Sequence, residues 1–266
     1  MLIITCIAII ITPHLIKYKG FETKGNIITG YKGEGLEVVI PDGTIEIAEY
    51  AFRNQSQITS IVIPSSVTKI GYGAFYNCSS LTSIAIPNSV TSIGDSAFFG
   101  CSSLTSIIIP NSVTSIGSST FTDCISLTSI GIPNSVTSIG DSAFGGCSSL
   151  ASIEIPNSVT SIGPNAFYNC SSLTSITLPF IGNTLNETTN THFGYIFGAS
   201  SYSCNVDYIP SSLKEVTITG GTSIGNFAFI GCSSLTIYCE ANSKPSGWNY
   251  EWNRNNCPVI WGYIIE

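Results

Sequence analysis

Apolar residues recur along this chain at a regular interval of 23 positions, and the first part of each unit alternates apolar and polar positions. In the unit that begins at Leu81, Ile84 and Ile86 stand two positions apart, which is the period of side chains on one face of a β-strand. Pro87 follows, and because proline cannot donate a backbone hydrogen bond, the strand ends there. Each unit therefore predicts one short strand, and the repetition of such strands predicts a single parallel sheet.

Several residue types keep this interval over most of the chain. Each occupies a fixed place in the unit, in three columns: Pro41, Pro64, Pro87, Pro110, Pro133, Pro156 and Pro179; Ile47, Ile70, Ile93, Ile116, Ile139 and Ile162; Phe52, Phe75, Phe98, Phe121, Phe144 and Phe167. Such residues occupy equivalent places in successive coils of a solenoid, where each unit buries its apolar side against its neighbours. From Val38 to Ile237 we count about nine strands, which predicts a rod roughly 40 Å long.

The second part of the unit predicts a bend that returns the chain to the next strand. Val90, Ile93 and Phe98 are expected to point inward, and Gly94 lies where a side chain would not fit. The segment from 95 to 99 is expected to form one turn of α- or 3₁₀-helix.

The complete unit, LxxIxIPxxVTxIGxxAFxxCxS, resembles the 23-residue leucine-rich repeats of the BspA-like surface proteins of bacteria and protists. The similarity extends from about Gly33 to Ser234, and the Pro, Gly, Ala-Phe and Cys positions coincide in unit after unit. The resemblance implies a leucine-rich-repeat arc with one parallel β-sheet, short strands joined by helical or 3₁₀ turns, and capped ends. It also implies a non-enzymatic protein at the cell surface or outside the cell, used in adhesion and in binding a partner.

We expect five segments along the chain: 1–32 as an apolar segment and cap, 33–179 as regular repeats, 180–212 as an insertion, 213–238 as the final degenerate repeats, and 239–266 as an aromatic C-terminal cap. Leu2 to Ile11 is apolar but only about half as long as a helix that spans a bilayer. It covers the open edge of the first coil, is the remnant of a truncated chain, or is a degenerate export signal. Because no convincing signal peptide is present, a cytoplasmic location stays open beside the surface location.

The regular spacing breaks once, after Pro179. Leu173 and the next matching residue, Leu213, are 40 positions apart instead of 23, so about 17 residues are inserted in a segment rich in aromatic residues and glycine. A long insertion leaves the path of the coil on one face, where solenoids often bind partners. It either serves as such a binding loop or packs on the rod as a local cap.

The C-terminal segment contains all three tryptophans, Trp248, Trp252 and Trp261. Bulky aromatic side chains cover the exposed apolar surface and the unpaired strand edge at the end of a solenoid. Flat aromatic faces also stack on sugars. The segment is therefore predicted either to cap the rod or to offer a platform for a carbohydrate.

Five of the ten cysteines follow the Ala-Phe segment at the repeat interval: Cys78, Cys101, Cys124, Cys147 and Cys170. Unpaired cysteine is among the most buried residue types, so we predict a buried ladder of unlinked thiols. The sequence has no CxxC pair that would indicate a zinc site. Cys239 and Cys257 in the tail either form a disulfide or remain two separate thiols.

Charge limits the classes of partner. Only 9% of the 266 residues are charged, the formal net charge is −7, and the mean hydropathy is +0.34. So few cations disfavour a phosphate backbone or an anionic bilayer, and we expect no nucleic-acid partner and no membrane insertion beyond the possible export signal. His14 and His192 are the only histidines and have no partners at catalytic or metal-ligand spacing, so we expect no catalytic residue, metal or cofactor.

These patterns predict a binding module that presents its sheet to a protein or a glycan. Outward-facing strand residues and aromatic residues of the insertion are expected to contact the partner: Val62, Ala85, Ile108, Glu154, Thr177, Tyr195, Phe197 and Tyr202. Two other functions stay open. Five Ser-Val-Thr segments, from Ser66 to Thr160, would form a hydroxyl array suited to an ordered surface such as ice. The other is an enzyme with its site in the insertion 180–212.

Overall fold

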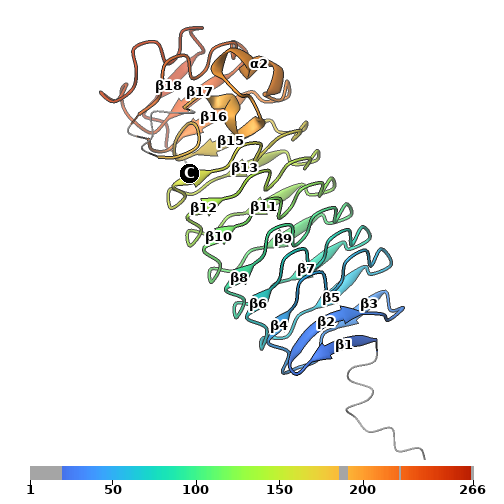
Figure 1. Ribbon diagram of the computed structural model, residues 1–266. Helices are drawn as coiled ribbons and strands as arrows, with labels where there is room; N and C mark the ends of the chain where they lie inside the picture. The colour runs from blue at the N-terminus through green and yellow to red at the C-terminus, as the bar shows by residue number, and fades with distance from the viewer. Residues whose placement is uncertain (1–19, 186–190, 222, 265–266) are drawn as a thin grey trace, which may run out of the picture.

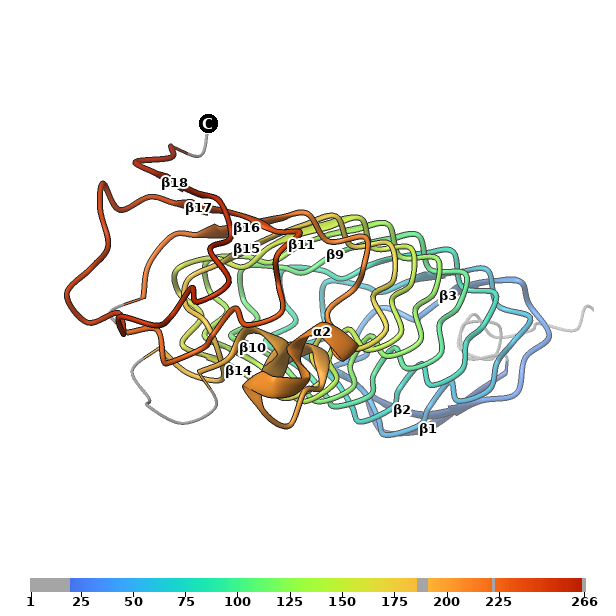
Figure 2. The same ribbon diagram turned by 90° about the horizontal axis from the view of Figure 1, so that it is seen from above.

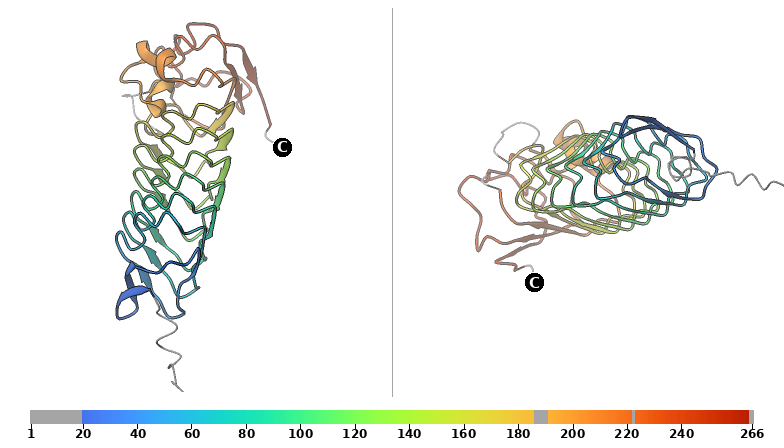
Figure 3. Two further views of the ribbon diagram at one scale, coloured as in Figure 1. Left: turned by 90° about the vertical axis from the view of Figure 1, so that its right-hand side faces the viewer. Right: turned by 90° about the horizontal axis from the view of Figure 1, so that it is seen from below.

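The computed structural model of this protein describes residues 20–185, 191–221 and 223–264, and Figure 1 shows them as a stack of similar coils. The described chain starts in a hairpin at one end of the stack and finishes in a short strand at the other. The views in Figure 3 show a long and slender molecule, so the predicted repeat solenoid is confirmed. The apolar segment 2–11 and His14 lie outside the described residues.

A row of parallel strands, which we call the first row, runs along the whole stack. Its members are β3 (Glu37–Val39), β5 (Ser60–Val62), β7 (Ser83–Ala85), β9 (Ser106–Ile108), β11 (Ser129–Gly131), β13 (Ser152–Glu154), β15 (Ser175–Leu178), β16 (Glu215–Ile218), β17 (Thr236–Cys239) and β18 (Val259–Trp261). Strands β3 to β11 form one hydrogen-bonded sheet and strands β13 to β18 another. The register pairs residues one unit apart, for example Ile84 with Ile107, because each coil repeats the path of the one before.

A second row consists of two-residue parallel strands on another side of the coils: β4 (Glu46–Ile47), β6 (Lys69–Ile70), β8 (Ser92–Ile93), β10 (Ser115–Ile116), β12 (Ser138–Ile139) and β14 (Ser161–Ile162). It begins with the antiparallel hairpin of β1 (Phe21–Lys24) and β2 (Ile27–Tyr31), whose second strand pairs with β4. The sequence predicts one strand per coil and one sheet, and the second row corrects this prediction. Two residues are too few to show an alternation of apolar and polar positions.

The Ala-Phe segment of each coil forms tight turns instead of the predicted turn of helix. Ser96 has a φ of 56°, in the left-handed region, and Ser119 in the next coil has a φ of 54°. A left-handed residue interrupts the right-handed path of a helix. Backbone NH groups of this segment donate to the following coil, as the NH of Phe98 does to the carbonyl oxygen of Thr120 at 2.9 Å. The segment therefore links coils to one another.

The glycine that follows each second-row strand from β6 to β14 is required by the close approach of neighbouring coils. A Cβ atom at Gly94 would lie 2.5 Å from the backbone nitrogen of Tyr72. One at Gly140 would lie 2.5 Å from the backbone nitrogen of Ser118. Real contacts of this kind do not occur, so the prediction that a side chain would not fit at Gly94 is confirmed.

Stacked phenylalanine rings fill the centre of the solenoid. Neighbouring ring centroids are 5.3–5.5 Å apart and the ring planes differ by 4–23° in the phenylalanine spine, which consists of Phe52, Phe75, Phe98, Phe121, Phe144 and Phe167. All six side chains are fully buried. At the N-terminal end, Tyr31 of the hairpin lies against Phe52, with 5.4 Å between ring centroids. The hairpin thus covers the first ring of the spine.

The insertion lies between β15 and β16, which pair with each other although Ser175 and its partner Glu215 are far more than one unit apart in the chain. Its helical elements are η1 (Phe193–Phe197), η2 (Tyr202–Cys204) and α2 (Asn205–Tyr208). Asn205 is fully buried and ties these elements together. Its Oδ1 accepts a hydrogen bond from the NH of Gly194, and its Nδ2 donates to the carbonyl oxygen of Ala228 in the next coil.

Two phenylalanines of the insertion continue the spine. Phe197 lies 6.3 Å from Phe167 between ring centroids, and Phe193 lies 5.1 Å from Phe229 in the next coil. The backbone NH of Phe193 donates to the carbonyl oxygen of Ala228, which is the same kind of bond that links the regular coils. The described part of the insertion therefore packs on the rod, as one of the two sequence interpretations has it.

Tryptophan side chains cover the C-terminal end of the spine. Trp252 lies edge-on to Phe229 with 5.9 Å between ring centroids, and Trp248 lies 4.8 Å from Trp252. Trp248 and Trp252 are buried, and Trp261 is half-buried against both. Their apolar surface is used inside the protein, which favours a cap over a carbohydrate platform.

The predicted ladder of five unlinked thiols is confirmed: all five cysteines from Cys78 to Cys170 are free and fully buried. Each thiol donates to a phenylalanine carbonyl of the preceding coil, as Cys124 Sγ does to Phe98 O at 3.2 Å. Burial raises the pKa of Cys78 to about 12. Cys239 and Cys257 are also buried and unlinked, so the two tail cysteines form no disulfide.

We expect the substitution Phe121→Ala to reduce the free energy of unfolding by about 3 to 5 kcal/mol, because it leaves a cavity between two stacked neighbours. Ile125→Ala in the same coil is the control, since Ile125 is 48% exposed and should change the stability by less than about 1 kcal/mol. Urea denaturation of both variants gives the comparison. Equal, small losses would contradict the role of the spine.

We expect the thiol ladder to make the fold less stable at high pH. Burial raises the pKa of Cys78 to about 12 in the folded state, whereas the unfolded chain loses this proton near the ordinary thiol pKa of 9.0. The folded state therefore binds more protons above pH 9, and the free energy of unfolding decreases from pH 9 to pH 12. Denaturation curves across this interval should show a smaller decrease for Cys78→Ala than for the natural chain. An identical decrease would mean that Cys78 titrates equally in both states.

Candidate functional site

The outward side of the first row, which we call the sheet face, carries alternate side chains of each strand. In β9, Ser106 and Ile108 are exposed and Ile107 is buried, and β5, β7, β11 and β13 follow the same alternation. The exposed fraction of Ile108 is 79% and that of Val62 is 56%. The inward and outward assignment made from the sequence is therefore confirmed for these strands.

One column of the sheet face differs from coil to coil. The strand registers align it as Val39, Val62, Ala85, Ile108 and Gly131 in the first sheet and as Glu154, Thr177, Thr217, Tyr238 and Ile260 in the second. We call it the variable column. Its neighbour from β5 to β15 is serine in every strand. A constant frame beside one changing position varies the surface along the rod, with identical neighbours in the column only in the pairs Val39 and Val62, and Thr177 and Thr217.

Sequence reasoning missed the members at both ends of the variable column. Val39, with 66% of its side chain exposed, stands one repeat unit before Val62, so the repeat itself contained the signal. Thr217, Tyr238 and Ile260 follow the insertion, where equivalent residues no longer keep the repeat interval. Only the pairing of the strands reveals their place.

Two hollows lie on the sheet face. The first, of about 420 Å³, extends over β5, β7 and β9 with Ala85 between Val62 and Ile108. The second, of about 510 Å³, extends over β11 and β13. Its lining includes Gly131 and Glu154 of the variable column, Ser129 and Ser152 of the serine column, and Asn111 and Asn134 beyond the strands. One hollow is thus mainly apolar and the other mainly polar.

Glu154 is the only charged residue on the first-row strands from β5 to β15. Its side chain is exposed. Among the residues that the structure describes, the ion pairs are Lys32 with Glu22, Lys69 with Glu46, and Arg254 with Glu251, so no described cation pairs with Glu154. From β5 to β15 the sheet face therefore offers one carboxylate in neutral surroundings.

The structure does not bring the insertion candidates together with the sheet face. Figure 2 shows α2 on the side of the rod opposite to β9 and β15. Phe197 is fully buried in the spine, so it is not available to a partner. Tyr195 is half-buried against the core, and Tyr202, with 44% exposed, lies against Phe227. Of the three, only Tyr202 offers a large exposed surface.

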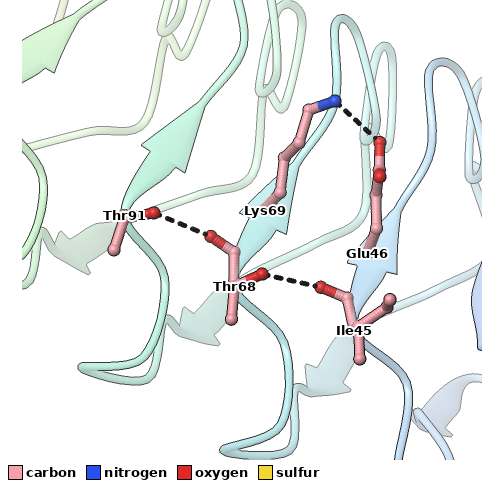
Figure 4. A network of polar contacts seen from close by, with 5 residues as sticks. All are labelled: Ile45, Glu46, Thr68, Lys69 and Thr91. Atoms are coloured by element: carbon pink, nitrogen blue, oxygen red, sulfur yellow. Dashed lines mark hydrogen bonds and ion pairs between the residues drawn. The ribbon is translucent and has the colours of Figure 1, made fainter.

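The Ser-Val-Thr segments are hydrogen-bonded along the rod. The hydroxyl of Ser89 donates to the backbone carbonyl oxygen of Val67 at 2.7 Å. In the same way, the hydroxyl of Thr91 donates to the backbone carbonyl oxygen of Thr68 at 3.3 Å. Figure 4 shows two steps of the threonine ladder beside the ion pair of Lys69 with Glu46. These hydroxyl donors satisfy backbone carbonyls of the neighbouring coil, which accounts for their repetition without an ordered surface as ligand.

The described residues contain no group of three or more His, Cys, Asp or Glu side chains that could hold a metal ion. His192 is buried in the insertion, with Nε2 3.0 Å from the carbonyl oxygen of Ala199 and its ring edge-on to Tyr195. These contacts place it in the packing of the insertion.

None of the helices within 20–185, 191–221 and 223–264 has the length and apolar character needed to cross a bilayer.

The fold and the sheet face define a leucine-rich-repeat solenoid. The family model described as "BspA type Leucine rich repeat region" matches residues 31–147 and 114–236, with 6 copies. The chain therefore belongs to this family, as the repeat unit predicted. A comparison with curated proteins found no match.

Solved structures of leucine-rich-repeat proteins are similar to this chain. One from T. pallidum is 28% identical, with 82% of this chain and 88% of that chain covered and a TM-score of 0.48. A leucine-rich cell surface protein of Faecalibacterium prausnitzii is 25% identical, with 86% and 75% covered and a TM-score of 0.46. One from Bacteroides ovatus is also 25% identical, with 86% and 78% covered and a TM-score of 0.39.

We expect Ile108→Asp to leave the fold intact, with a melting temperature within a few degrees of the natural chain, because this side chain points to solvent. Ile107→Asp, one position earlier, buries a carboxylate in the core and should unfold the coil or lower the melting temperature strongly. Circular dichroism melts of the pair give the test. If Ile107→Asp were the more stable variant, the inward and outward assignment would be wrong by one residue, and every strand side chain would point to the opposite face.

Proposed function

We propose that this protein is a non-enzymatic binding module, displayed outside the cell, whose sheet face contacts a protein or glycan partner. The observation that carries the proposal is the variable column, in which exposed apolar side chains and one carboxylate stand on a constant frame of serine. Membership of the BspA-type family supports it, because leucine-rich-repeat solenoids characteristically act as binding surfaces. The surface location rests on the same family resemblance.

The energetic centre of this surface is expected at its larger exposed side chains. Binding energy concentrates in a minority of interface residues, and serine and glycine bury little surface. Val39, Val62 and Ile108 are each more than half exposed and lie along one line of the sheet face. A partner that covers them removes apolar surface from water, at about 25 cal/mol for each Å².

Thr177 is expected to contribute less to the contact with the partner, because its side chain is half-buried. Its neighbours in the variable column are Glu154 and Thr217.

The opposite side of the rod offers Tyr202 as the alternative contact. The insertion cannot be tested by deletion of its aromatic residues, because Phe193 and Phe197 belong to the spine and their loss would disturb the fold.

A glycan array and a panel of immobilised extracellular-matrix proteins would identify a partner of the purified chain. We expect Ile108→Asp and Glu154→Lys each to weaken binding to that partner by about tenfold or more, because both side chains face outward on the sheet face. Thr137→Asp, on the exposed threonine ladder of another side, is the matched control and should bind like the natural chain. Surface plasmon resonance gives the affinities.

Two results would contradict the sheet face as the site. The first is unchanged affinity in both variants. The second is a loss of affinity in Tyr202→Ala alone, which would place the contact on the insertion. Failure of the chain to bind any member of both panels would leave the proposed partner classes without support.

A further inference from the structure

The backbone conformation at Gly131 does not require a glycine. Its φ is not in the left-handed region, and a Cβ atom added to it would meet no atom within 4 Å. The glycines of the second-row turns differ, since a Cβ atom at Gly117 would lie 2.2 Å from Asp95 Oδ1. Glycine weakens a strand and often marks a position where a ligand or another backbone comes close. The absence of a side chain at 131 therefore shapes the surface rather than the fold.

The hollow of about 510 Å³ lies over this glycine, and we call it the Gly131 hollow. Within the variable column, Ile108 precedes Gly131 by one coil and Glu154 follows it by one coil. Asn111 and Asn134 bring amide groups to the same hollow. A carboxylate and amide groups line a gap over Gly131 that no side chain fills, and Ile108 stands beside this gap as the register partner of Gly131.

We propose that the Gly131 hollow receives a lysine or arginine side chain of a protein partner. The proposal rests on the proposed function and names the chemistry of the contact. The aliphatic stem of the cation lies over Gly131 and extends toward Ile108, the register partner of Gly131 on β9. The charged group pairs with Glu154 and donates to the amide oxygens of Asn111 and Asn134. Gly131 leaves room for the stem to cross the strand.

Charge favours this occupant over an anionic or a neutral one. Glu154 is the only charge on these strands, and no described cation neutralises it. The whole chain carries a formal net charge of −7, which steers cationic segments toward it. A second charged group is missing from the first-row strands β5 to β15, so one cation satisfies the hollow.

The test uses N-acetyl-arginine methylamide and N-acetyl-lysine methylamide as probes, with N-acetyl-norleucine methylamide as the uncharged control. Titration of the full chain is followed by NMR at the Gly131 amide and the Ile108 methyl groups. We expect both cationic probes, and not the norleucine probe, to shift these signals. Glu154→Gln should weaken the effect about two- to fivefold, as for an exposed ion pair, while Glu49→Gln on another side leaves it unchanged.

Gly131→Val fills the hollow and should abolish the shift at Ile108. Ala85→Val enlarges another member of the same column by a similar amount, outside the Gly131 hollow, and serves as its control. Both variants should fold, because Val62 already occupies the equivalent position of β5. A shift that survives in Gly131→Val overturns the proposal, as does an equal shift with the norleucine probe.

Two further outcomes separate this inference from the proposed function. If methyl glucoside shifts the Gly131 signal and the cationic probes do not, the hollow takes a sugar and the inference is wrong. If a partner found on the panels loses affinity with Ile108→Asp but keeps it with Gly131→Val, the sheet face binds without the hollow. That result also overturns the inference, while the proposed function stands.

Discussion

Contact between successive coils is the constraint on which the whole structure depends. A single coil has no core of its own, because its inward side chains meet mainly those of its neighbours. The phenylalanine spine, the buried thiols and the turn NH groups all direct their contacts along the axis of the rod. The residue types that recur at the buried positions satisfy this axial packing. The variable column faces outward and lies outside this packing.

The ends and the insertion show the same constraint where the repeat is lost. Tyr31 replaces a preceding ring at one end, and Trp252 receives Phe229 near the other. In the insertion, the ring of Phe197 packs against the coil before it and the ring of Phe193 packs against the coil after it. Two rings together therefore fill the place that one phenylalanine fills in a regular coil. The additional chain is accommodated because the spine stays continuous, and the remaining residues pack outside it.

Sequence periodicity was sufficient for the features that repeat. The first row, the inward and outward faces and the buried cysteines follow from residues such as Ile107, Ile108 and Cys124, whose environment recurs in each coil. The second row was missed because two residues contain no period. Phe197 was misplaced because aromatic residues of an insertion look alike whether they pack in a core or face solvent. The hollow at Gly131 depends on which strands lie side by side and on the volume left empty between their side chains, and neither can be read from the sequence.

The near identity of the central coils raises the question of what fixes their alignment during folding. A strand displaced by one whole unit would meet the same side chains, since Ser106 and Ser129 or Ile107 and Ile130 are interchangeable partners. Local contacts therefore cannot distinguish the native pairing from one that skips a coil and extrudes it as a loop. A coil that is skipped in this way has no neighbours, so its phenylalanine and cysteine side chains lose the burial that they have in the native stack. The complete stack is therefore favoured by the total apolar area that it buries and not by the identity of any one contact.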